Sequence, residues 1–404
     1  MLLGIRLENF QILERLELGL TREAWEKAAA DGATPAQLRS LPHLQEITVL
    51  IGRNASGKSS VLRALGLFSA LMRHDLPYAA NAADPDGFTG LLRHGSREPL
   101  LMEVLLSLPD IAAPVCYRLV IRADSEGRPR LESEVLSLLA GGAGQNPGRT
   151  VLELTEDGAF LDLSGSGRRS LEPGDRKRAL LPLVGRLTGE GLPRRLLAEL
   201  SSWFSCRFLE ELSTTTQMHQ RQGAHHRLNE EATNIPNVIA WYERRNPAAW
   251  RRIRERIAAV HPAGRRLREN WLSGTLSAAE ERFLALLLLL ADPEPRRLLL
   301  MENPDNGLYH DSVTRLGDEL RRYGLRHEHS QIVMSTHNPV LLENFAPQEV
   351  WVLSREAGDR ALQAATLPLV ADLYKEGIGM AAIWYGGHLE DFITAAPGEP
   401  DATS

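Results

Sequence analysis

The chain has 404 residues, of which 43% are hydrophobic, and its formal net charge at pH 7 is −6. This length and composition indicate a folded, soluble protein of two domains or of one large domain with an insertion. The negative charge gives no overall attraction to nucleic acid, so any such contact must come from a local basic patch. Two cysteines occur, Cys116 and Cys206, without metal-ligand spacing. Their number excludes a disulfide scaffold and fits a reducing cytoplasm.

The N-terminus and the apolar segments indicate a cytoplasmic protein. The first residues have a strand-like pattern and lack the charged and then apolar build of a signal peptide, so we expect no export. The longest apolar run, residues 283–291, has about half the length needed to span a bilayer and predicts a buried helix. We therefore expect no membrane partner.

The first part of the chain predicts one half of a nucleotide-binding core. Residues 1 to about 75 have the pattern strand, turn, strand, loop and helix, with an apolar strand at 47–51. Strand patterns follow at 101–106, 117–121 and 131–135. We expect these later strands to form an antiparallel flank on the core.

The loop after strand 47–51 matches G-x-x-x-x-G-K-[ST], the pattern of a phosphate-binding loop. Its backbone N–H groups would surround the β-phosphate, and the N-terminus of the next helix would add partial positive charge. Lys58 would neutralise phosphate charge, and Ser59 would offer a hydroxyl to Mg²⁺. The sequence therefore predicts binding of ATP or GTP with Mg²⁺. The candidate nucleotide-binding residues here are Gly52, Arg53, Asn54, Ala55, Ser56, Gly57, Lys58, Ser59 and Ser60.

Two later apolar strands, at 298–301 and 331–334, each end in polar residues. Glu302 follows the first strand, and His337 lies just after the second. Ligands of a parallel α/β sheet bind at the carboxyl ends of its strands, so we expect both side chains to approach the γ-phosphate and its metal.

In their order along the chain, these motifs resemble those of the ABC-type ATPases of the SMC/RecF/OLD-like group, in particular the stand-alone AAA family ATPases of bacterial defence loci. The matching segments are residues 5–10, 52–59, 277–282, 302–308 and 335–339. The resemblance implies an α/β fold with an ABC-type P-loop NTPase core, a mixed sheet flanked by helices. The antiparallel β flank and an inserted helical lid would be added to this core.

The resemblance also implies roles for single residues and for the assembly. Ser59 and Glu302 would hold Mg²⁺, and His337 would sense the γ-phosphate. Ser277 would begin a signature that closes on the ATP of a second protomer, so ATP would join a head-to-tail homodimer or a higher oligomer. The candidate catalytic residues are Lys58, Glu302, Asn303 and His337.

The chain then divides into four expected segments. Gly-rich loops at 141–148 and 164–167 and a helical pattern at 181–267 indicate an insertion. We expect the first half of the ATPase core with its β flank at 1–140, the inserted loop and lid at 141–270, the second half of the core at 271–394, and a disordered tail at 395–404.

Two positions depart from the pattern of the family. Asn303 stands where the resemblance implies a catalytic glutamate, and an amide cannot take a proton from water. We expect slow hydrolysis, unless Asp305 acts as a relocated base. Ala279 stands at the glycine position of the signature, where its methyl group would obstruct the contact in trans. A signature at 272–275 is the alternative, and Ser277 as a plain helix N-cap is another.

Nine arginines lie between residues 243 and 269, and an apolar stripe predicts that they occupy the other face of an amphipathic helix. One interpretation is a phosphate-backbone contact for DNA or RNA, and the other is a solvated face with ion pairs inside the lid. The candidate nucleic-acid residues are Arg251, Arg252, Arg254, Arg265 and Arg266. His219, His225 and His226 lack neighbouring ligands at metal-binding spacing, so we do not predict a metal there.

Three functions remain open. The first is an ATP-driven switch for a nucleic-acid-directed partner, in antiphage defence as the resemblance implies. That partner would be a protein such as a nuclease in trans, because the segment after His337 lacks the acidic cluster of a Toprim-type nuclease. The second is a regulatory scaffold that binds ATP without hydrolysing it. The third is a motor ATPase, either of the DNA-repair type or as a transporter subunit. The separation of about 220 residues between Lys58 and Ser277 disfavours the transporter.

Overall fold

The computed structural model describes residues 1–140, 148–163, 167–172, 174–189, 191–209, 226–356 and 358–389. The expected tail at 395–404, most of both Gly-rich loops, His219 and His225 lie outside these described residues. None of the described helices is both long enough and apolar enough to cross a membrane.

A mixed six-stranded sheet forms the core, with strand order β10-β11-β12-β3-β13-β14. Its first five strands are parallel, and β14 pairs antiparallel with β13 at one edge. The central parallel strands are continuous apolar runs, which is typical of a sheet buried on both faces. The strands are β3 (Ile47–Ile51), β10 (Phe204–Ser205), β11 (Leu298–Glu302), β12 (Gln331–Ser335), β13 (Val350–Ser354) and β14 (Arg360–Gln363).

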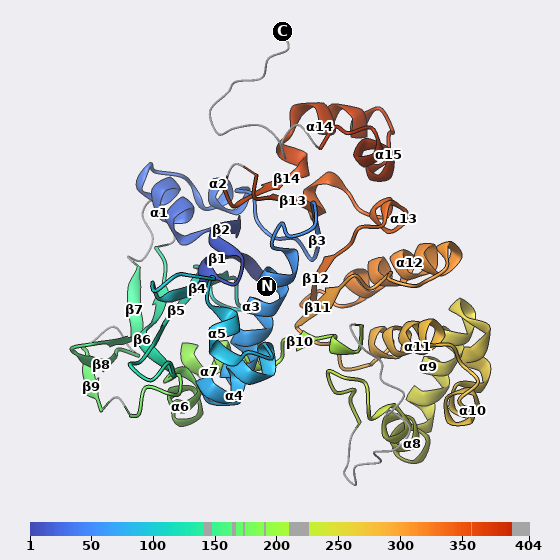
Figure 1. Ribbon diagram of the computed structural model, residues 1–404, viewed down its shortest axis with the longest axis horizontal. Helices are drawn as coiled ribbons and strands as arrows, with labels where there is room; N and C mark the ends of the chain where they lie inside the picture. Colours follow the sequence, from blue (N-terminus) through green and yellow to red (C-terminus); the bar gives the residue numbers. More distant parts are fainter. Residues whose placement is uncertain are drawn as a thin grey trace.

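A second sheet of eight strands is antiparallel throughout, with the order β2-β1-β4-β5-β6-β7-β8-β9. It contains the expected antiparallel flank and extends to the left in Figure 1. The strands are β1 (Leu2–Phe10), β2 (Leu13–Gly19), β4 (Leu100–Leu106), β5 (Val115–Ala123), β6 (Pro129–Leu138), β7 (Arg149–Thr155), β8 (Gly158–Leu161) and β9 (Arg169–Leu171).

Helix α3 (Lys58–Leu71) lies between the two sheets, and ten of its fourteen residues are buried. Its apolar side chains share one core with Leu50 and Leu300 of the mixed sheet and with Met102 of the antiparallel sheet. The helix that follows the phosphate loop is therefore fixed on two sides. On this side of the mixed sheet lie also α4 (Leu76–Ala83), α5 (Gly87–Leu91), α6 (Leu181–Leu187) and α7 (Leu192–Ser201).

The other face of the mixed sheet packs against a second core of helices, visible on the opposite side of Figure 1. Here α11 carries the continuous apolar run that predicted a buried helix, and that expectation is confirmed. The helices are α8 (Ile235–Arg245), α9 (Pro247–Val260), α10 (Leu267–Ser273), α11 (Ala278–Leu290), α12 (His310–Arg326), α13 (Pro339–Leu342), α14 (Pro368–Lys375) and α15 (Met380–Tyr385).

Part of the segment 141–270, which we expected to form an inserted loop and helical lid, belongs to the two sheets. Strands β7, β8 and β9 lie where we expected loop and lid, and they extend the antiparallel sheet. Strand β10 also lies in the expected lid, yet it pairs with β11 at the edge of the core sheet. The helices between β10 and α11 are thus the part of the segment 141–270 that stands apart from both sheets (Figure 1).

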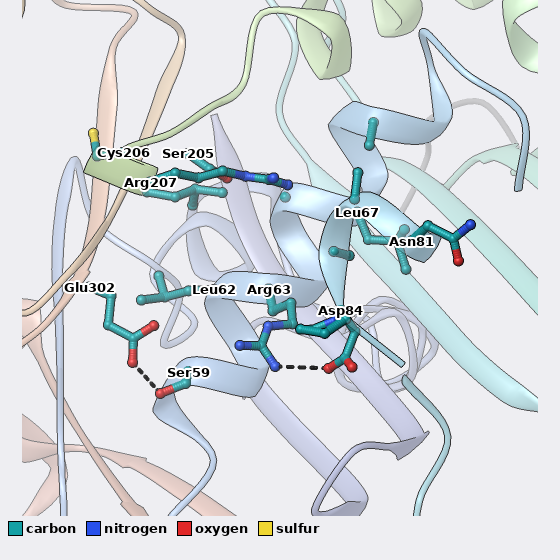
Figure 2. A pocket seen from close by; sticks show the side chains of 16 residues that line it. Ser59, Leu62, Arg63, Leu67, Asn81, Asp84, Ser205, Cys206, Arg207 and Glu302 are labelled. Atoms are coloured by element: carbon teal, nitrogen blue, oxygen red, sulfur yellow. Dashed lines mark hydrogen bonds and ion pairs between the residues drawn. The ribbon is translucent and has the colours of Figure 1, made fainter. Parts of the chain in front are cut away.

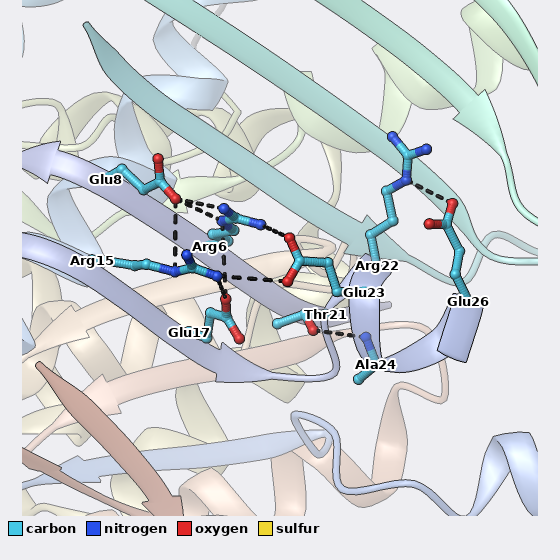
Figure 3. A network of polar contacts seen from close by, with 9 residues as sticks. All are labelled: Arg6, Glu8, Arg15, Glu17, Thr21, Arg22, Glu23, Ala24 and Glu26. Carbon is cyan, nitrogen blue, oxygen red and sulfur yellow. Dashed lines mark hydrogen bonds and ion pairs between the residues drawn. The ribbon is translucent and has the colours of Figure 1, made fainter. Parts of the chain in front are cut away.

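Two helices that we did not predict, α1 (Arg22–Ala30) and α2 (Pro35–Arg39), cover the antiparallel sheet beside β1. Cross-strand ion pairs fix the register of β1 and β2 under them, as Figure 3 shows. Arg6 lies opposite Glu17, and Glu8 lies opposite Arg15. Glu23 of α1 also pairs with Arg6. Opposite charges on paired strands stabilise one register against a slip by one residue.

Candidate nucleotide site

The candidate residues meet at the carboxyl ends of three neighbouring parallel strands. Leu50 of β3 pairs with Ser335 of β12, and Ser335 pairs with Glu302 of β11. The phosphate loop follows β3 directly, and His337 lies two residues beyond β12. The register therefore brings the loop, the acid and the histidine to one edge of the sheet, where ligands of parallel α/β sheets bind.

The phosphate loop needs glycine at two points. Gly52 has a φ of 140°, and a Cβ atom there would lie 2.3 Å from the carbonyl oxygen of Leu353. Gly57 has a φ of 101° and precedes α3, and a Cβ atom there would lie 2.6 Å from a methyl group of Leu13. Both glycines let the chain turn sharply so that the first N–H groups of α3, which have no partner inside the helix, point at the loop.

Lys58 extends back over the loop. Its Nζ atom donates to the carbonyl oxygens of Gly52 and Arg53 at 2.9 Å each, and to Ser56 Oγ at 3.3 Å. Burial lowers the pKa of Lys58 to about 8, although the charge of Glu302 acts in the opposite direction. The ammonium group is thus held by neutral oxygens, and phosphate oxygens would stabilise its charge.

Ser59 and Glu302 are in direct contact, because the hydroxyl of Ser59 donates to Glu302 Oε1 (Figure 2). A hydroxyl and a carboxylate oxygen at the end of a phosphate loop fit the oxygen ligands that Mg²⁺ prefers. These two side chains would hold the ion, which would neutralise charge on the phosphates of a bound nucleotide.

The remaining loop residues divide into two groups. Arg53, Asn54 and Ala55 are exposed, and Arg53 pairs with Glu356 at 2.5 Å. Ser60 is buried and donates its hydroxyl to Gln11 Oε1 at 2.8 Å. The side chain of Ser60 therefore belongs to the packing between α3 and the β1–β2 turn.

Asn303 has a left-handed backbone with a φ of 44°. Its N–H donates to Ser335 Oγ at 3.2 Å, and Ser335 Oγ approaches Asn303 Oδ1 at 3.4 Å. Asparagine tolerates this conformation better than longer side chains do. Ser335 was not predicted as a partner of Asn303, although its place in the Ser-Thr-His segment could have indicated a role at this site.

Asp305 is buried, with 8% of its surface exposed, and accepts a hydrogen bond from Thr336 Oγ1 at 2.8 Å. Burial raises the pKa of its carboxyl group. This contact joins the loop after β11 to the loop after β12 and favours a structural role for Asp305 over that of a relocated base. Burial also lowers the pKa of His337, and the charge of Lys58 lowers it further. A neutral imidazole beside the loop can donate a hydrogen bond from its N–H group to a phosphate oxygen.

Ser277 is the N-cap of α11. Its hydroxyl accepts from the Glu280 N–H at 3.3 Å, and its own N–H donates to Glu280 Oε2 at 2.9 Å, which forms a capping box. Ala279 lies in the first turn of the same helix. The guanidinium of Arg282 lies against Gly307, where an added Cβ atom would be 2.9 Å from Nη2. Helix α11 therefore contacts the loop that follows Glu302.

A cavity of about 340 Å³ adjoins Ser59 and Glu302 (Figure 2). Ser59 and Glu302 line one part of it, and the rest follows the flank of α3 towards Arg63 and Asp84, which form an ion pair at 3.2 Å. Ser59 is the one residue of the phosphate loop in this lining. The cavity is therefore a neighbour of the candidate nucleotide site, with room for water beside Ser59 and Glu302.

The arginines of the lid lie far along the chain from this site. Trp250, Ile253, Ile257 and Val260 of α9 are buried, which confirms the amphipathic helix. Arg256 pairs with the buried Glu319 at 2.7 Å, so it is a packing residue. The candidate residues Arg251, Arg252, Arg254, Arg265 and Arg266 are exposed. Arg266 pairs with Glu269 at 3.5 Å, and no carboxylate in the described part of the chain pairs with the other four.

A search of curated proteins found no match to this sequence. Among solved structures, an SMC head bound to the C-winged helix domain of ScpA is similar to this chain, with 14% identity and a TM-score of 0.50. The match covers 89% of this chain and 96% of that chain. The SMC head domain from Thermotoga maritima has 12% identity, coverage of 90% and 98%, and a TM-score of 0.42. An SMC head from Pyrococcus furiosus, bound to the C-terminal domain of ScpA, has 14% identity, coverage of 93% and 98%, and a TM-score of 0.48.

A family model described as "AAA domain, putative AbiEii toxin, Type IV TA system" matches residues 47–137 and 210–343, which is more than half of the chain. The first matched segment contains the phosphate loop, and the second contains Glu302 and His337. The two sheets around α3 also agree with the fold of an SMC head. The chain belongs to this AAA-domain family and has the fold of an ABC-type, SMC-like P-loop ATPase.

Proposed function

We propose that the chain binds Mg-ATP, forms a head-to-tail dimer around it and hydrolyses it slowly. The contact between Ser59 and Glu302, beside a lysine held only by neutral oxygens, carries this proposal. It supports a site with groups placed for phosphates and their metal. Asn303, hydrogen-bonded to Ser335 where a catalytic base would stand, supports slow turnover.

The dimer would switch or scaffold a nucleic-acid-directed partner, such as a nuclease in trans. The family description, which names a toxin–antitoxin system, supports a role in bacterial defence against phage. The exposed arginines of α9, without carboxylate partners in the described residues, support contact with a DNA or RNA backbone. A cytoplasmic location fits both partners.

A scaffold that binds ATP without hydrolysing it is the second candidate, and Asn303 favours it. The two functions share the nucleotide site and differ in turnover. The motor ATPase is the third candidate and requires rapid turnover.

Equilibrium ATP binding and multiple-turnover hydrolysis, measured with Mg²⁺ and with or without duplex DNA, test the proposal. We expect binding in the native chain, its loss in Lys58→Ala, and turnover far below that of a motor. Absence of ATP binding in the native chain would refute the proposal. Rapid turnover that Lys58→Ala abolishes would favour the motor.

A further inference from the structure

A second cavity, of about 270 Å³, lies at the opposite end of α3 from the phosphate loop. Its lining comes from the C-terminal end of α3, the segment 174–180 and helix α6. We refer to it as the α3–α6 pocket. Because α3 spans fourteen residues, about 20 Å at the rise of an α-helix, this pocket does not overlap the nucleotide site.

The α3–α6 pocket combines an apolar floor with a basic rim. Leu71, Met72 and Leu154 contribute buried apolar surface. Four arginines and a single acid, Asp175, complete the charged part of the lining; the arginines are Arg73, Arg176, Arg178 and Arg186. This positive excess stands out in a chain whose net charge is −6.

The basic segment is held in place before any partner binds. Glu134, fully buried, accepts from the N–H groups of Leu180 at 2.6 Å and Leu181 at 2.8 Å. It also accepts from the hydroxyl of Tyr117 at 2.9 Å. The guanidinium of Arg176 donates to the carbonyl oxygen of Thr155 at 2.6 Å. A preformed surface loses little conformational entropy on binding.

Two arginines remain available for a partner. Arg73 already pairs with Glu230 at 3.1 Å. Arg178 and Arg186 are exposed, and within the residues that the structure describes no carboxylate pairs with either of them. Arginine can bind a carboxylate through two parallel hydrogen bonds, so both side chains suit an acidic partner.

Large apolar side chains are exposed beside the same rim. Leu183, a lining residue, is 56% exposed, and Leu187, one turn further along α6, is 77% exposed. Tyr78 is 58% exposed, and its ring lies 4.3 Å from that of His74, another lining residue. Exposed apolar groups clustered around a pocket are typical of protein interaction sites.

We propose that the α3–α6 pocket docks an acidic segment of a partner protein, which inserts one large apolar side chain between Arg178 and Arg186. The volume fits a single aromatic or leucine side chain and is below the usual range for small-molecule sites. The apolar floor favours a protein over a nucleic-acid backbone, which would present phosphates and sugars. This inference rests on the proposed function in one respect, because it takes the docked protein to be the partner that the ATP-held dimer would switch.

Fluorescence anisotropy with the full chain, without nucleotide, tests this docking site. The probes are short fluorescein-labelled peptides in which aspartate and glutamate flank one tryptophan, phenylalanine or leucine. Matched probes carry lysine at the acidic positions or alanine at the apolar position. We expect at least one acidic peptide to bind, and both changes to weaken binding by about tenfold or more.

Variants of the chain locate the binding. Arg178→Glu with Arg186→Glu, and separately Leu183→Asp, are expected to weaken the acidic peptide by about tenfold or more, whereas Arg178→Lys with Arg186→Lys retains part of the affinity. All three changes lie on exposed side chains, and Arg130→Glu with Arg169→Glu, two exposed arginines outside the pocket lining, serves as the matched control that leaves peptide binding unchanged.

Three results would overturn the inference. The first is that no acidic peptide binds more tightly than its lysine counterpart. The second is that the Arg178 and Arg186 reversals have no effect. The third is that duplex DNA or phosphatidylserine vesicles bind the native chain more tightly than any peptide does, and that Arg178→Glu with Arg186→Glu weakens this binding. ATP affinity, measured on the same proteins, distinguishes failure of the proposed function from failure of the docking inference. If the native chain does not bind ATP, the proposed function is contradicted, whereas the peptide result still stands.

Discussion

The charge of Lys58 links nucleotide binding to pH. In the free protein its pKa is about 8, because burial opposes the charged form. Bound phosphates favour the ammonium form and raise the pKa, so binding at pH 8 takes up a proton. The sign follows from the lowered pKa: ATP affinity falls as pH rises above about 8, where the free lysine is neutral.

Calorimetry in two buffers with different ionisation enthalpies measures this uptake. With Mg²⁺ present we expect about half a proton per ATP at pH 8 and much less at pH 7, where Lys58 is already charged in the free protein. An equal uptake at both values would show that the lysine does not carry this proton.

Asn303 is expected to limit hydrolysis. Asn303→Glu supplies a base and should raise turnover by about 10²- to 10⁴-fold. The left-handed backbone at φ 44° makes the longer side chain cost roughly 1 kcal/mol of stability. Turnover is measured by phosphate release at saturating Mg-ATP, and stability by denaturant unfolding.

Asn303→Gln is the matched control, because it has the length of glutamate without the basic carboxylate. Turnover should stay low in it. Asp305→Asn tests the rival base, and since Asp305 is buried against Thr336 we expect the residual turnover to persist. Equal turnover in the native chain and Asn303→Glu would show that Asn303 is not the limiting residue.

At the scale of elements, the exposed face of α9 carries the proposed nucleic-acid contact. Arg251→Glu with Arg252→Glu should weaken binding of duplex DNA. The slope of the logarithm of the binding constant against the logarithm of salt concentration should also become less steep, by about one unit per lost phosphate contact. A titration over several salt concentrations measures both. Arg130→Glu with Arg169→Glu, two exposed arginines of the antiparallel sheet, is the control. If both pairs behave alike, the patch has no specific role.

Elements with a motif or a continuous apolar run were predictable from the sequence. Strands β3, β11 and β12 and helix α3 lie where the pattern placed them. Strands β8 and β9 were missed because they have only four and three residues, and β7 was missed because it lies between two Gly-rich loops. Pairing with β6 stabilises them, and that partner is not visible locally.

The site was predictable where strand order brings motifs together. The contact between Ser59 and Glu302 follows from two motifs at the carboxyl ends of β3 and β11, which lie on either side of β12 in the sheet. The left-handed turn at Asn303 and the use of the Ser60 hydroxyl by Gln11 did not follow, because both depend on tertiary neighbours. The α3–α6 pocket was missed for the same reason, since its lining comes from three separate segments of the chain.

At the scale of the whole molecule, α3 joins the two ends of the proposed switch. Its N-terminus carries the phosphate loop and its C-terminal end lines the α3–α6 pocket. The mixed sheet and the antiparallel sheet enclose it in one core. A partner docked at one end and a nucleotide at the other would therefore contact the same rigid helix without competing for space.

The most direct test of the central claim is sedimentation velocity of the native chain and of Lys58→Ala with Mg-ATP, with Mg-ADP and without nucleotide. We predict that the native chain forms a dimer with Mg-ATP alone, that this dimer persists because hydrolysis is slow, and that Lys58→Ala does not form it. The same oligomeric state under all conditions, in both proteins, would contradict an ATP-held dimer.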